Sequence, residues 1–157
     1  MKEWKESLSN FAGIYNASPL GKSENHLLQV IDIFVKLTGM HSDHCAKEKK
    51  DAQLMRKEKE QAIYQSLGEE AILEKSNQEL LPHFLKGRDQ MIQKAGGVKK
   101  WKKLSEIQQA EWQTQMMEKL VIELGESSYQ QLTPSEKCML SLFIWASCGC
   151  HKDLNTV

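Results

Sequence analysis

Positive charge concentrated in one segment is the feature of this chain most suited to binding chemistry. Residues 86–103 carry seven basic side chains and a single acidic one, Asp89, which gives a formal charge of +6. The whole 157-residue chain is neutral, so the remaining residues sum to −6. We define the basic block as the cationic positions of this segment together with its tryptophan: Lys86, Arg88, Lys94, Lys99, Lys100, Trp101, Lys102 and Lys103. Such a cluster attracts acidic surfaces or phosphates, and a tryptophan within it can anchor a bound partner.

The position of these lysines along the chain adds to the argument. A long helix is predicted over 98–124, and four lysines of the basic block fall in its first turns, whereas glutamates gather toward its end. Each positive charge at the positive end of a helix dipole costs about 0.3–1 kcal/mol at low salt. The layout therefore suggests that a molecule outside the chain requires these lysines.

Three interpretations of the basic block are open at this stage. The lysines could lie over Trp101 and face a predicted acidic helix of the same chain, residues 69–81. They could instead bind a protein with an acidic surface, with the lysines steering the encounter. In the third interpretation they neutralise phosphates while Trp101 stacks on a nucleic-acid base. No known nucleic-acid-binding module is recognisable, and the chain as a whole is not basic, so the protein partner is preferred to nucleic acid.

Cysteine and histidine form two short clusters that could bind a metal. His41 and Cys45 are spaced i, i+4, so they would share one face of a helix, and tetrahedral zinc needs four such ligands. The two clusters are about a hundred residues apart, and Cys-x-Cys is not the usual zinc-knuckle spacing. The plainer expectation is that the cysteines are free thiols or small core residues, and no cofactor is predicted. The candidate ligands are His41, His44, Cys45, Cys148, Cys150 and His151.

Catalytic motifs are not apparent in the sequence. It contains no serine-centred elbow, phosphate-binding glycine loop or HExxH pattern. The pair Gly96-Gly97 precedes a predicted helix, but a bare Gly-Gly usually marks a turn. We therefore expect a protein that is not an enzyme, although a metal- or thiol-dependent protein that uses the cysteine and histidine clusters remains an alternative.

Hydrophobic periodicity predicts an all-α fold, a single-domain bundle of about six or seven helices over residues 1–157. Two predicted helices, 24–38 and 134–147, are apolar on most sides and are expected to be mostly buried. Thr133-Pro134-Ser135-Glu136 has the residues of a capping box and should open the second. Gly68 and Gly125 are expected to end the exposed helix 40–67 and the helix 98–124. The tail from about Gly149 is expected to fray.

Composition limits the class of protein. Hydrophobic residues make up 40% and charged residues 27% of the chain, which is typical of a globular protein. No signal peptide or membrane-spanning segment is apparent, so a cytoplasmic location and no membrane partner are expected. The sequence thus predicts a non-enzymatic helical interaction module, a small regulator, adaptor or chaperone-like factor that binds an acidic protein. A homodimer through the 40–67 or 98–124 seam is compatible with the pattern.

Overall fold

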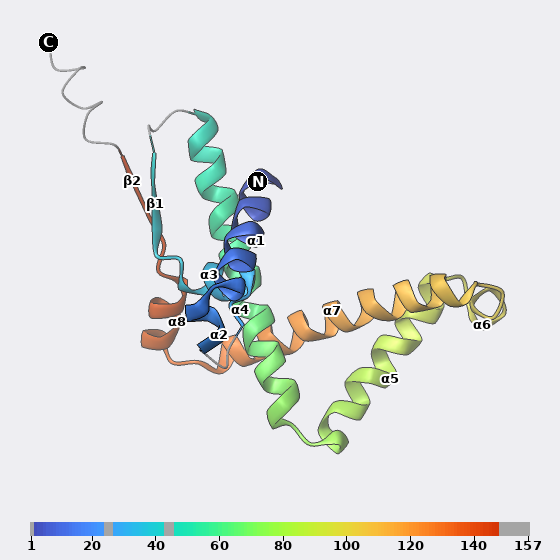
Figure 1. Ribbon diagram of the computed structural model, residues 1–157. Helices are drawn as coiled ribbons and strands as arrows, with labels where there is room; N and C mark the ends of the chain where they lie inside the picture. The colour runs from blue at the N-terminus through green and yellow to red at the C-terminus, as the bar shows by residue number, and fades with distance from the viewer. Residues whose placement is uncertain (1, 24–26, 43–45, 148–157) are drawn as a thin grey trace, which may run out of the picture. The chain divides into compact units, whose positions relative to one another are not determined.

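Helices dominate the structure, which confirms the all-α class. The structure is a computed structural model, and it describes residues 2–23, 27–42 and 46–147. Those residues form two compact units, one made of residues up to Ile63 and from Leu132 onward, and one spanning Tyr64–Gln131. The elements, shown in Figure 1, are α1 Lys2–Ala17, α2 Pro19–Ser23, α3 Val30–Lys36, β1 Gly39–Ser42, α4 Ala46–Glu74, α5 Asn77–Lys94, α6 Val98–Trp101, α7 Glu106–Gln131, α8 Pro134–Ser141 and β2 Ile144–Ser147.

The first unit has its core where α3, the first part of α4 and the segment after α8 meet. Phe34, Met55, Ala62 and Phe143 are its buried residues, and partly buried side chains of α1 and α3 pack against them. Lys59 is 3% exposed, although it carries a charge. Its ammonium donates to the carbonyl oxygens of Val35 at 2.8 Å and Leu37 at 2.7 Å, and so it satisfies the C-terminal end of α3. Burial lowers the pKa of Lys59 below its ordinary value.

The predicted buried helix 24–38 is wrong in its bounds, because α3 covers only Val30–Lys36. The Asn16 side chain explains the late start: its amide donates to the Leu28 carbonyl, and its oxygen accepts from the Leu28 N–H, both at 2.9 Å. These bonds hold residue 28 outside a helix, and a capping box of Gln29 and Asp32 opens α3 instead. Phe34 is the buried residue of this helix.

The predicted buried helix 134–147 is also wrong beyond its first two turns. Its start is confirmed, since Thr133 accepts from the Glu136 N–H and Glu136 accepts from the Thr133 N–H. However, α8 ends at Ser141 and buries none of its residues. Residues 144–147 form β2, which pairs in parallel with β1 in the register Gly39 to Ile144 (Figure 1). A Cβ at Gly39 would overlap the Ile144 carbonyl oxygen, so glycine is required at this close approach.

The second unit is built from the last part of α4 with α5, α6 and α7. Its hydrophobic core is a cluster of the buried residues Ala71, Leu80, Leu120 and Leu124. Contrary to expectation, α4 continues through Gly68 and α7 continues through Gly125. Both glycines lie where the two helices touch: a Cβ at Gly68 would overlap the Val121 carbonyl oxygen, and one at Gly125 would overlap that of Tyr64. The two glycines therefore permit close helix packing and do not end helices.

The break between α4 and α5 falls at residues 75–76, inside the helix predicted over 69–81. Ser76 starts α5 with a capping box, because the Glu79 carboxylate accepts from the Ser76 backbone N–H at 3.0 Å and from its hydroxyl at 2.6 Å. The same bonds lower the pKa of Glu79. α5 then runs through Pro82 and stops, as predicted, just before Gly96 and Gly97, whose φ values are 92° and 90°.

Candidate functional site

A tight turn carries the four lysines nearest to Trp101. Gly96 and Gly97 adopt positive φ after α5, and the Gly97 N–H donates to the Ile92 carbonyl at 2.8 Å. The chain then forms α6, a single helical turn at the tip where α5 leads into α7 (Figure 1). The Gln109 side chain ties α6 to α7, because its amide donates to the carbonyls of Trp101 and Leu104, both at 3.2 Å. The turn is thus fixed by hydrogen bonds at both ends.

Trp101 is half-buried, whereas the four lysines beside it are all exposed. We call these four residues the tip lysines: Lys99, Lys100, Lys102 and Lys103. Lys100 lays its aliphatic stem across Gly96, where a Cβ would collide with it. Within the described parts of the chain no ion pair joins a tip lysine to a carboxylate; in the basic block only Arg88 has one, with the adjacent Asp89 at 3.2 Å. The tip therefore presents four positive charges to solvent.

The expectation of one helix over 98–124 is wrong, and with it the argument from the helix dipole. α7 begins at Glu106, with an acidic residue in its first turn. Ser105 and Gln108 hold that end reciprocally: the Ser105 N–H donates to the Gln108 side chain at 3.1 Å, and the Gln108 N–H donates to the Ser105 hydroxyl at 3.3 Å. The tip lysines precede this helix and do not oppose its dipole, so their significance rests on exposure and clustering alone.

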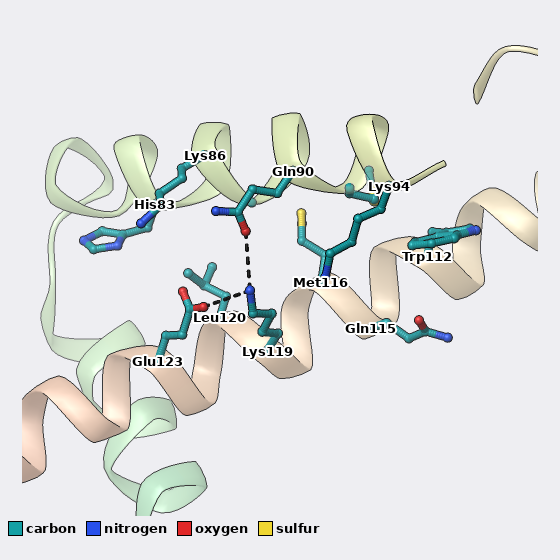
Figure 2. A pocket seen from close by; sticks show the side chains of 12 residues that line it. His83, Lys86, Gln90, Lys94, Trp112, Gln115, Met116, Lys119, Leu120 and Glu123 are labelled. Atoms are coloured by element: carbon teal, nitrogen blue, oxygen red, sulfur yellow. Dashed lines mark hydrogen bonds and ion pairs between the residues drawn. The ribbon is translucent and has the colours of Figure 1, made fainter. Parts of the chain in front are cut away.

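Two other members of the basic block line a groove between α5 and α7 with a volume of about 200 Å³. Figure 2 shows side chains of both helices around it, with Lys86 and Lys94 on one wall and Lys119 on the other. We call this the lysine groove. Its lining residues are His83, Lys86, Gly87, Gln90, Met91, Lys94, Trp112, Gln115, Met116, Lys119, Leu120 and Glu123.

The floor of the lysine groove is apolar and its walls are polar. Met91 and Leu120 are buried, while Trp112 and Met116 are partly exposed. Gly87 allows α5 to approach Met116, whose Cγ would lie 3.2 Å from a Cβ at that position. A surface with this composition can hold apolar side chains that have carboxylates beside them.

Lys119 bridges the groove, although it lies outside the basic block and was not singled out from the sequence. Its ammonium lies 3.4 Å from the Gln90 side-chain oxygen and 3.0 Å from the Glu123 carboxylate, as the dashed lines of Figure 2 mark. The pairing with Glu123 partly neutralises Lys119. Lys86 and Lys94 have no such carboxylate among the described residues, so they are the exposed positive charges of the groove.

The structure thus separates the basic block into two surfaces within the second unit, the tip and the lysine groove. Arg88 belongs to neither, because it pairs with Asp89 and does not line the groove. Both surfaces are suited to binding anionic groups.

The proposed metal ligands are only partly visible. His41 lies in β1 and not on a helix, so the helical i, i+4 spacing expected for it does not apply. His44, Cys45, Cys148, Cys150 and His151 lie outside the described residues. Over residues 2–23, 27–42 and 46–147, no three histidine, cysteine, aspartate or glutamate side chains gather as metal ligands would.

None of the helices that the structure describes is both long enough and apolar enough to cross a membrane. No family model, curated protein or solved structure matches the chain.

Proposed function

We propose that this protein is a non-enzymatic helical interaction module that binds a protein with an acidic surface through the basic block. The observation that supports this most strongly is the exposure of the tip lysines without carboxylate partners in the described part of the chain. Four like charges held on one fixed turn repel each other, and a partner's carboxylates would relieve that repulsion. Trp101, half-buried among them, offers an apolar anchor.

The hydrogen bonds of acidic residues within 69–81 also support an external partner for the tip lysines. The interpretation that the lysines face residues 69–81 would require ion pairs to glutamates there. Glu69 instead accepts from the Gln65 side chain at 2.9 Å, and Glu79 caps α5 at Ser76. Where the structure describes both groups, it shows no ion pair between these glutamates and the tip lysines. An external acidic surface is the better complement for the tip.

Charge reversal at the tip separates a binding role from a structural one. Replacing the four tip lysines with glutamate should change the free energy of unfolding by less than about 0.5 kcal/mol, because the side chains are exposed and form no ion pair with the described residues. Capture of the acidic partner from nuclease-treated lysate of the native host should be lost. A matched control reverses four exposed lysines elsewhere, Lys22, Lys49, Lys50 and Lys57. A marked loss of stability in the tip variant, or equal capture by the tip variant and wild type, contradicts the proposal.

Nucleic acid is the competing ligand for the same surface. Filter binding with single-stranded and duplex nucleic acid, from low to physiological salt, distinguishes the two. The proposal predicts no retention even at low salt. Retention that weakens steeply with salt and disappears in the tip variant assigns the basic block to phosphate binding instead.

A further inference from the structure

An exposed apolar stripe follows the first half of α7. Ile107, Ala110, Thr114 and Met117 are spaced three and four residues apart, the repeat of a helix that packs along a partner helix. Ile107 is 74% exposed and Met117 is 37% exposed, whereas Leu124, further along the same repeat, is buried. The described chain therefore covers only the end of the stripe. We call these four residues, together with the adjacent Glu111 and Glu118, the acidic seam.

The acidic seam and the lysine groove lie on opposite sides of α7. With 3.6 residues per turn, Ala110 and Lys119 point about 180° apart. One helix thus presents an exposed apolar stripe flanked by Glu111 and Glu118 and, behind it, a groove with an apolar floor flanked by Lys86 and Lys94. The two faces are complementary in hydrophobicity and charge, and neither can satisfy the other within one molecule because they lie on opposite sides of the same helix.

We propose that the acidic seam of one copy of this chain docks into the lysine groove of a second copy. Glu111 and Glu118 are separated by about 10.5 Å along their helix, and Lys86 and Lys94 by about 12 Å along theirs, so two carboxylates can face two ammonium groups. The apolar side chains of the stripe would then lie over the apolar floor of the groove. Seam against seam is disfavoured, because it places glutamates opposite glutamates.

This contact joins two different surfaces, so it is heterologous. Each copy that donates its seam still has an empty groove, and each that donates its groove still has an empty seam. Copies would therefore add head to tail, to a ring or an open chain. The inference rests on the proposed function, because both assign the binding of acidic protein surfaces to the basic block. The inference adds that the lysine groove is the binding site and that a second copy of the chain is the ligand.

Two variants test the pairing by analytical ultracentrifugation of the full chain. The groove variant is Lys86→Glu with Lys94→Glu, and the seam variant is Ile107→Gln with Met117→Gln, which keeps good helix formers. Wild type should increase in mass with concentration at low ionic strength, and salt of about 0.5 M should return it toward monomer. Each variant alone should remain monomeric. An equimolar mixture should form a 1:1 complex and nothing larger, because one intact groove and one intact seam remain.

The control Lys49→Glu with Lys57→Glu changes net charge equally on exposed α4 positions and should associate like wild type. If circular dichroism shows that the groove variant is unfolded, Lys86→Gln with Lys94→Gln replaces it. Wild type that stays monomeric at low salt, association that ignores salt, or a mixture that forms no 1:1 complex overturns the inference. The tip variant distinguishes this inference from the proposed function: it should lose the acidic host partner but keep self-association.

Discussion

Replacing Gly125 or Gly68 with alanine is expected to destabilise the protein by about 3 kcal/mol, which lowers Tm by roughly 10 °C. At both positions the added methyl group would overlap a backbone carbonyl oxygen of the facing helix, Tyr64 or Val121. A backbone carbonyl cannot rotate away as a side chain can, so α4 and α7 must move apart. This movement would disturb the contact between Tyr64 and Tyr129, whose ring centroids are 5.4 Å apart. Urea unfolding followed by circular dichroism measures the loss.

The matched control is the same substitution where space is free. A Cβ at Gly13, in α1, meets no atom within 4 Å. Alanine there should be neutral or stabilise by up to about 1 kcal/mol, because it favours the helix over the unfolded chain. If Gly125→Ala behaves like Gly13→Ala, the close crossing of α4 and α7 does not exist.

Replacing Lys59 with methionine should destabilise the first unit by about 2–3 kcal/mol, even though the substitution removes a costly buried charge. The carbonyl oxygens of Val35 and Leu37 would lose their donor at the end of α3. Bonds from a charged donor contribute more than neutral ones, and an unsatisfied buried acceptor costs about 1–3 kcal/mol. Methionine fills a similar volume, so the loss reports the hydrogen bonds and not a cavity.

Lys57→Met on the same helix is the control for that experiment. Lys57 is exposed, and its replacement should change the free energy of unfolding by less than about 0.5 kcal/mol. Equal stability of the two variants in urea would show that the Lys59 bonds contribute nothing.

Local signals in the sequence predicted the fold best. The capping box at Thr133 and the stop at Gly96-Gly97 are both confirmed, since each depends on a few adjacent residues. The Ser76–Glu79 and Ser105–Gln108 boxes carry the same kind of signal, and they start α5 and α7 at positions other than those predicted from hydrophobic periodicity.

Long-range contacts explain what the sequence could not reveal. The sequence predicts helix ends at Gly68 and Gly125 because glycine is a poor helix former. Only the backbone of the facing helix shows why glycine is required at both positions. The Asn16 side chain forms hydrogen bonds with the backbone of Leu28, 12 positions along the chain, and these bonds keep Leu28 out of a helix. The pairing of β1 with β2 joins segments about a hundred residues apart, and local periodicity carries no signal for it.

The candidate site was found in part. Charge counting located the basic block, because clustering is visible in the sequence itself. Its division into tip and groove, and the place of Lys119 opposite Lys86 and Lys94, depend on how α5 packs on α7. The start of α7 at Glu106 removes the unfavourable dipole contact that a helix over 98–124 would have given the same lysines.

Photo-crosslinking from the tip tests most directly whether a protein binds there. A benzoylphenylalanine residue in place of Lys103 is irradiated in nuclease-treated lysate of the native host, with the same residue in place of Lys49 as control. The account predicts a discrete protein adduct from position 103 that is absent from position 49 and disappears when the other tip lysines are reversed. No adduct at position 103, or the same adducts from both positions, would contradict it.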